Sequence, residues 1–92
     1  MPEEYFMITR TVNVKMSKNL SASPAALLVQ QASKYDSIIY IESGERKVNA
    51  KSIMGMMSIA IDDGDELMIK CDGRDENDAI SAMEGFLTGA GA

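Results

Sequence analysis

The chain has 92 residues, of which 46% are hydrophobic and 25% charged, the usual balance of one globular domain. Fourteen acidic and nine basic side chains give a net charge of −5, which argues against nucleic acid or an anionic membrane as a direct partner. The chain contains no histidine, so a His–Cys zinc site, a Ser-His-Asp triad and a phosphohistidine carrier are excluded.

The first third of the chain predicts a strand followed by a helix. Apolar and polar residues alternate over residues 10–16, which is the period of a half-buried strand. Ser23 followed by Pro24 is typical of a helix start, and the helix is expected over residues 25–34. Its buried side would be lined by Ala25, Leu28, Val29 and Ala32.

The remaining elements are a hairpin, a short helix, a strand and a last helix. Residues 38–42 and 46–50 predict two strands joined at Ser43-Gly44. A short helix is expected over residues 52–60, a turn over 62–65 and a strand over 66–71. Asp75 is expected to cap the last helix, in which Ala79, Ile80, Met83, Phe86 and Leu87 keep helical spacing. Four strands with one apolar face need helices over that face, so the expected fold class is α+β with βαββαβα order.

Two features that suggest metal or thiol chemistry are better interpreted as structural. The acidic clusters 62–66 and 72–76 lack the spacing of a calcium loop, and we interpret them as solvated turns. Cys71 falls on the predicted buried face of its strand, and no base or metal partner for it is visible in the sequence, which favours packing. We expect no metal and no other cofactor.

The sequence also predicts a cytoplasmic chain. No stretch approaches the roughly 20 apolar residues of a membrane span. The N-terminus lacks the basic region and apolar core of a signal peptide. A lone cysteine cannot form an internal disulfide, which is usual in a reducing compartment.

The segment around Ser52 is more informative. Ser52 stands at the predicted start of the short helix, where it can be an ordinary N-cap or can carry a phosphate beside free amides and the positive end of the helix dipole. Ile53, Met54 and Met57 share one side of this helix, whereas Met56, Ile59 and Ala60 take another. A short helix cannot bury both sides on one sheet, so an exposed apolar patch for a partner is expected, with ordinary core packing as the alternative.

Four stretches of the chain resemble the HPr family of small phosphocarriers of the bacterial sugar phosphotransferase system. The resemblance spans residues 12–86 and is carried by residues 22–26, 29–35, 48–55 and 75–79, most specifically by Lys-Ser-Ile-Met-Gly at 51–55. It implies an open-faced β-sandwich, in which four antiparallel strands carry three helices on one side.

The same resemblance implies that this chain is not a phosphocarrier. HPr has its catalytic histidine in a His-Ala-Arg-Pro motif, where this sequence reads Ser21-Ala22-Ser23-Pro24. Ser21 takes the place of the histidine and Ser23 that of the arginine. A serine phosphate ester is far more inert than a phosphoimidazole, so we expect no catalytic residue and no enzyme.

The resemblance also implies that this chain keeps the regulatory site of the family, as do the histidine-less HPr-like proteins called Crh. It implies that Ser52 is phosphorylated by an HPr kinase/phosphorylase. It also implies that the phosphoprotein is the corepressor of a LacI-type transcription factor in carbon catabolite repression. Partner-binding residues implied by the same match are Leu20, Lys51, Ile53, Met54 and Met57.

Alternatives to this phosphorylation-dependent regulator remain open. A constitutive binding or decoy module would occupy HPr partners through the same apolar residues, and Ser52 would then be only a cap. We expect one HPr-like domain over residues 1–92, with a core over 9–87 and a flexible tail over 88–92. The chain is expected to be a monomer or a weak dimer, because exchange of the first strand is a low-cost route to dimers.

Overall fold

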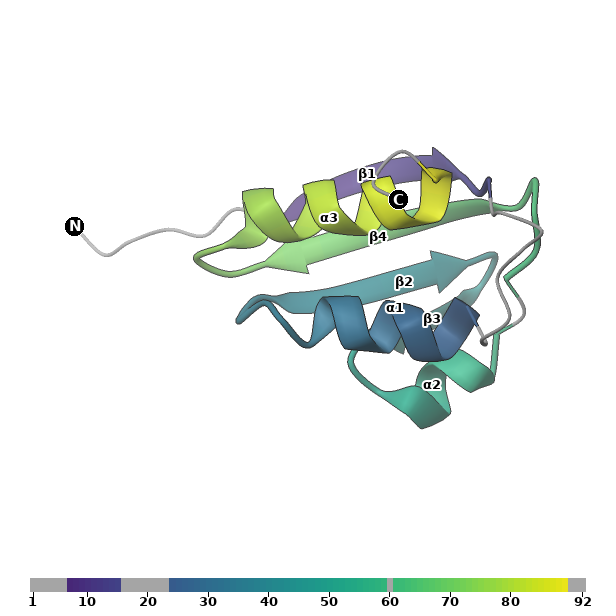
Figure 1. Cartoon of the computed structure of the whole chain (residues 1–92), viewed down its shortest axis with the longest axis horizontal. Helices are drawn as coiled ribbons and strands as arrows, with labels where there is room; N and C mark the ends of the chain where they lie inside the picture. The colour runs from purple at the N-terminus through teal and green to yellow at the C-terminus, as the bar shows by residue number, and fades with distance from the viewer. Residues whose placement is uncertain (1–6, 16–23, 60, 90–92) are drawn as a thin grey trace.

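The structure, a computed structural model, describes residues 7–15, 24–59 and 61–89. Within them the expected order of four strands and three helices is confirmed (Figure 1). The elements are β1 (Ile8–Asn13), α1 (Pro24–Ala32), β2 (Ile38–Ser43), β3 (Arg46–Asn49), α2 (Ile53–Met57), β4 (Glu66–Asp72) and α3 (Glu76–Thr88).

All four strands form one antiparallel sheet in the order β1-β4-β2-β3. The last strand in sequence therefore lies between the first two, and β4 and β2 form the centre of the sheet. Their register sets Ile41 opposite Ile69 and Ile39 opposite Cys71, and all four side chains are buried. The predicted β2–β3 hairpin is confirmed, and its turn uses Gly44 at φ +62°, a backbone conformation that favours glycine.

The three helices cover one face of this sheet (Figure 1). Helix α3 packs on β1 and β4, whereas α2 contacts α1 and β3. The other face carries polar pairs: Lys70 lies 2.6 Å from Glu42, and the Lys47 ammonium lies 4.4 Å from the centre of the Tyr40 ring. The predicted arrangement of one covered and one solvated face is confirmed. In the described ranges, the buried apolar residues are Val12, Val14, Ala25, Leu28, Ala32, Ile39, Ile41, Ala50, Met56, Ile59, Leu67, Ile69, Cys71, Ala79, Ile80, Met83 and Leu87.

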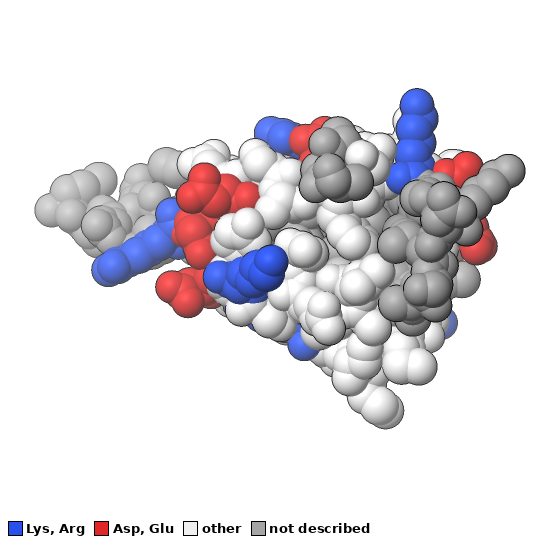
Figure 2. Space-filling model, in the orientation of Figure 1, with Lys and Arg blue, Asp and Glu red and all other residues white. Residues whose placement is uncertain are grey.

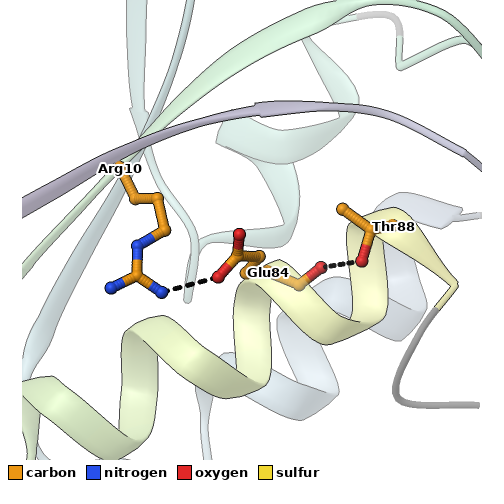
Figure 3. Close-up of polar contacts among 3 residues, drawn as sticks. All are labelled: Arg10, Glu84 and Thr88. Atoms are coloured by element: carbon orange, nitrogen blue, oxygen red, sulfur yellow. Dashed lines mark hydrogen bonds and ion pairs between the residues drawn. The ribbon is translucent and has the colours of Figure 1, made fainter.

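Polar contacts hold the edge strand β1 and the C-terminal helix together. Arg10 points to the helical side of the sheet, and its guanidinium donates to Glu84 of α3 at 2.6 Å (Figure 3). The Lys15 amide donates to the carbonyl of Leu87 at 2.8 Å. These contacts tie the end of α3 to the strand on which it packs.

Asp75 does not have the capping role that the sequence predicts. It occupies the N-cap position of α3, but its side chain makes no capping hydrogen bond. Instead, its carboxylate accepts from the backbone amides of Asp36 and Ser37, at 2.8 and 2.9 Å, and from the Ser37 hydroxyl. Because Ser37 is buried, the bonds from its amide and hydroxyl satisfy donors that have little access to water. Asp75 thus joins the start of β2 to the start of α3, a contact between residues 38 apart in sequence.

The same junction explains a glycine between β4 and α3. A side chain at Gly73 would place its Cβ 2.7 Å from the Cα of Ser37, which is closer than such atoms approach. The Gly73 amide donates to the carboxylate of the buried Glu76 at 3.0 Å. The 72–76 cluster is therefore partly a structural junction, and not merely the solvated turn that the sequence predicts.

Several element boundaries differ from the predicted ones, by one residue at the ends of β2, β3 and β4 and by more in β1, α1 and α2. Strand β1 begins at Ile8 and ends at Asn13, because it pairs residue by residue with β4. Helix α1 ends at Ala32, where the amides of residues 34 and 35 bond three residues back and tighten the last turn. Helix α2 ends at Met57, and α3 continues through Thr88 to a left-handed Gly89, one residue into the predicted tail.

In the described part of the chain, no helix has the length and apolarity needed to cross a membrane. The longest of these helices, α3, has 13 residues.

We predict that Asp75→Asn lowers the free energy of unfolding at neutral pH by about 2 kcal/mol, because it weakens charge-assisted bonds and leaves buried donors poorly satisfied. The pKa of Asp75 lies below its ordinary value of 3.8, chiefly because the Ser37 hydroxyl and then the Asp36 amide donate to the carboxylate. A lowered native pKa means that this stabilisation is present above about pH 4 and is lost as the pH falls through the native value. Denaturant unfolding between pH 7 and 3 measures it.

The matched control is Asp78→Asn, an exposed carboxylate in the first turn of the same helix. We expect it to change the unfolding free energy by less than about 1 kcal/mol, the size of a helix-dipole interaction. If the difference in unfolding free energy between the parent and Asp75→Asn stayed constant down to pH 3, this account of Asp75 would be contradicted.

Candidate functional site

The turn between β3 and α2 is shaped by Asn49. Its side-chain oxygen accepts from the Lys51 amide at 2.8 Å, and its carbonyl accepts from the Ser52 amide at 3.0 Å. An Asn that bonds the backbone two residues ahead is a recurrent turn former. Sequence reasoning missed this residue, although an Asn three residues before a predicted N-cap is the signal that could have identified it. Asn49 thereby positions Ser52 at the start of the helix.

Ser52 is the N-cap of α2, as the sequence predicts. Its hydroxyl oxygen accepts from the Gly55 amide at 3.1 Å, and its backbone is extended at φ −98° and ψ 114°. Its carbonyl accepts the first helical bond, from Met56 at 2.9 Å. The side chain is only partly buried. Gly55 has no side chain to place beside this hydroxyl. A Cβ at position 55 would lie 3.4 Å from Ser52 Oγ.

Lys51, which the resemblance implies as a partner-binding residue, is held by the chain itself. Its ammonium donates to the carbonyl of Tyr35, just beyond α1, at 2.5 Å. The side chain is partly buried. Lys51 therefore connects the segment after α1 to the start of α2, with a positive charge one residue before Ser52.

Helix α2 exposes the apolar side that its periodicity predicts. The exposed fractions are 42% for Ile53, 80% for Met54 and 69% for Met57. Met56 is fully buried in the same helix, and Ile59 beyond it is 7% exposed. We call Ile53, Met54 and Met57 the α2 patch. In Figure 2 the surface at the α2 end of this face shows no charged side chain over the helix itself.

The acidic 62–65 turn and Cys71, which the sequence indicates are structural, have contacts that agree with that interpretation. The 62–65 turn is closed by its own groups, because the Asp62 amide donates to the Asp65 carboxylate at 2.9 Å. Among the residues that the structure describes, no group of three or more acids or cysteines could hold a metal ion. Cys71 is fully buried, and burial, followed by the charges of Glu76 and Asp75, raises the pKa of its thiol to about 11. The thiol is therefore protonated at neutral pH.

Three residues singled out from the sequence, Leu20, Ser21 and Ser23, lie outside the described residues. The candidate site therefore consists of Lys51, Ser52 and the α2 patch. It combines a hydroxyl at a helix start, a neighbouring positive charge and an apolar surface. Chemically, such a hydroxyl could carry a phosphate, and the apolar surface beside it could contact a partner.

A protein-family model described as "PTS HPr component phosphorylation site" matches residues 8–88. Among curated proteins, the HPr-like protein Crh of Halalkalibacterium halodurans is 46% identical over 81 residues, which cover 88% of this chain and 96% of that one.

Solved structures of relatives share the fold. The phosphocarrier protein HPr of Bacillus anthracis is 40% identical, with a TM-score of 0.81 over 89% of this chain and 98% of that one. A Bacillus subtilis Crh crystal structure, described as a domain-swapped dimer, is 41% identical, with a TM-score of 0.66 over 83% of this chain and 87% of that one. The resemblance seen in the sequence is thus confirmed over nearly the whole chain, and the chain belongs to the HPr family, with Crh among its relatives.

Proposed function

We propose that this chain is a regulatory HPr-like protein that is switched at Ser52. An HPr kinase/phosphorylase would transfer phosphate from ATP to the Ser52 hydroxyl in the cytoplasm. The phosphorylated protein would then dock on a LacI-type catabolite-control transcription factor as its corepressor. The α2 patch would form the apolar part of the docking surface, together with Leu20 and Lys51.

One observation carries this proposal: the partly exposed Ser52 hydroxyl directly precedes an apolar patch that the fold leaves uncovered. A phosphoserine adds roughly −1.5 to −2 charges and three strong acceptor oxygens. At the first turn of a helix these charges face free amides and the positive end of the helix dipole, so phosphorylation need not unfold α2. The phosphate would supply charged contacts to a partner's Arg or Lys beside the apolar surface.

The absence of histidine makes phosphate carriage a poor candidate for this family member. Ser21, at the family's histidine position by sequence match, would form a phosphate ester with little tendency to transfer its phosphoryl group. Ser23 supplies no guanidinium to hold the phosphate. Regulation through Ser52 needs neither group.

A second candidate function is supported by the present state of the site. The Ser52 hydroxyl already has a structural role as a cap, and the α2 patch is exposed without any phosphate. A constitutive or decoy module would therefore bind an HPr partner equally well with and without phosphorylation. The affinity ratio between the two forms distinguishes the candidates.

The first prediction from the proposed function concerns the phosphorylation site. After incubation with an HPr kinase/phosphorylase, ATP and magnesium, intact-mass measurement is expected to show one added phosphate on the parent and none on Ser52→Ala. Loss of the cap costs about 1 kcal/mol, so this variant should remain folded, as circular dichroism can check.

Ser58→Ala is the matched control, since Ser58 is an exposed serine at the other end of α2. It should accept one phosphate, as the parent does. A phosphate on Ser52→Ala would show that Ser52 is not the site.

The second prediction concerns docking. Calorimetry with the transcription factor is expected to show that phosphorylation tightens binding about tenfold or more, the effect of one charge-assisted hydrogen bond of roughly 1.5–3 kcal/mol. Met54→Ala should weaken binding of the phosphorylated form roughly tenfold, because it removes apolar surface that docking would bury.

Ile38→Ala is the control for surface hydrophobicity, because Ile38 is 48% exposed and lies on strand β2. We expect it to leave the affinity unchanged. Equal affinities of the phosphorylated and unphosphorylated parent would favour the constitutive module.

The third prediction concerns assembly: we propose a monomer or weak dimer. Exchange of β1 between two chains would preserve the β1–β4 pairing and the contact between Arg10 and Glu84, but between protomers. Because the exchanged strand would make the same interactions as it does within one chain, the dimer has little energetic advantage over two monomers. Light scattering should therefore show a mass that rises only at high concentration. A dimer that persists on extensive dilution would contradict this prediction.

A further inference from the structure

The methionines of α2 differ sharply in exposure within a few residues of one another. Met54 and Met57 are 80% and 69% exposed, whereas Met56 between them is fully buried, as is Met83 of α3. Methionine oxidation follows access of the oxidant to the thioether. The two exposed sulfurs of α2 are therefore open to a small oxidant in the folded protein, and the two buried ones are not.

We propose that Met54 and Met57 form a peroxide-sensitive modification site, and that their oxidation to sulfoxides weakens docking through the α2 patch. This rests on the proposed function, because the patch is the docking surface assigned there. Each thioether sulfur attacks one oxygen of hydrogen peroxide, the O–O bond breaks, and a sulfoxide and one water are formed. Reduction by a dithiol-dependent sulfoxide reductase returns the oxygen as water and leaves a disulfide on the reductant.

Because Met54 and Met57 lie in the α2 patch, their oxidation would change the polarity of the docking surface. A sulfoxide is a polar hydrogen-bond acceptor, so two of them would convert most of an apolar patch into a polar one. A partner surface that buries this patch would have to desolvate the new oxygens without returning their hydrogen bonds. Docking should therefore weaken, even though Ser52 and its phosphate are untouched.

The fold should tolerate the same modification. The side chains of Met54 and Met57 point away from the core, so the added oxygens displace no packed atoms. The bonds that hold α2, from Gly55 to the Ser52 hydroxyl and from Met56 to its carbonyl, involve neither thioether. Oxidation would thus change the surface without melting the helix.

The first experiment is peptide mapping of the folded parent during hydrogen peroxide treatment. We expect sulfoxide to form at Met54 and Met57 at least about tenfold faster than at Met56 and Met83, following their access to the oxidant. The denaturant midpoint of the doubly oxidised protein should equal that of the untreated protein. Similar oxidation rates at all four residues would overturn the proposed site, whatever the docking measurements show.

The second experiment compares binding of the Ser52-phosphorylated protein to the transcription factor before and after peroxide. Affinity should fall about tenfold or more, the loss of roughly 1.4 kcal/mol of apolar contact, and should recover after treatment with a sulfoxide reductase. The double variant M54L/M57L keeps apolar side chains that cannot form sulfoxides. Its affinity after peroxide, relative to its own untreated value, should not change.

Met7→Leu is the matched control, because Met7 is 47% exposed but lies outside α2. This variant should lose affinity on oxidation as the parent does. Oxidation of Met54 and Met57 with no change in affinity would overturn the regulatory role while leaving the proposed function intact. No binding by the untreated phosphoprotein would instead overturn the proposed function and, with it, the regulatory role; the oxidation map would still decide the modification site.

Discussion

One-sided burial of the four-stranded sheet is the constraint on which the rest of this structure depends. The inward row of β-branched and apolar side chains on β2 and β4 must be covered, and all three helices lie on that face. Helix α2 has five residues and packs at the β3 edge, so it can bury only Met56 and must leave its other side uncovered. The exposed patch is therefore a geometric consequence of the fold. In the proposed function, its value to a partner would come from its location directly after Ser52.

Much of this arrangement could be predicted from periodicity and turn chemistry. Alternation in β4 and the Ser43-Gly44 turn identify strands, and the spacing of Ile53, Met54, Met56 and Met57 identifies the two sides of α2. The roles of Asp75 and Asn49 could not be assigned in the same way. Asp75 in the sequence looks like any N-cap, and its partners Asp36 and Ser37 are brought to it only by the pairing of β2 with β4. The helix ends at Ala32 and Met57 also differ from the predicted ones, because backbone amides just beyond each end bond carbonyls three residues back.

Under the proposed function, the fold would keep one chemical role of its family without another. Phosphate carriage needs a nitrogen that holds the phosphoryl group at high transfer potential, and this chain has no histidine. A regulatory phosphate needs only a hydroxyl that a kinase can reach and a surface that a partner can read. In the proposed function, Ser52 would combine the first requirement with its structural role as a cap. The proposed switch would thus replace an existing neutral contact with a charged one at the same place.

The burial of Cys71 has a practical consequence for studying this protein. It is the sole thiol of the chain, it lies in the central strand β4, and its pKa of about 11 keeps it protonated near neutrality. A thiol reagent can reach it only when the sheet separates from the helices above it. The rate of labelling therefore reports opening of the core, and no cysteine has to be introduced. Any ligand that stabilises the closed molecule should slow that labelling, so a natural cysteine at the centre of the sheet can serve as a binding assay.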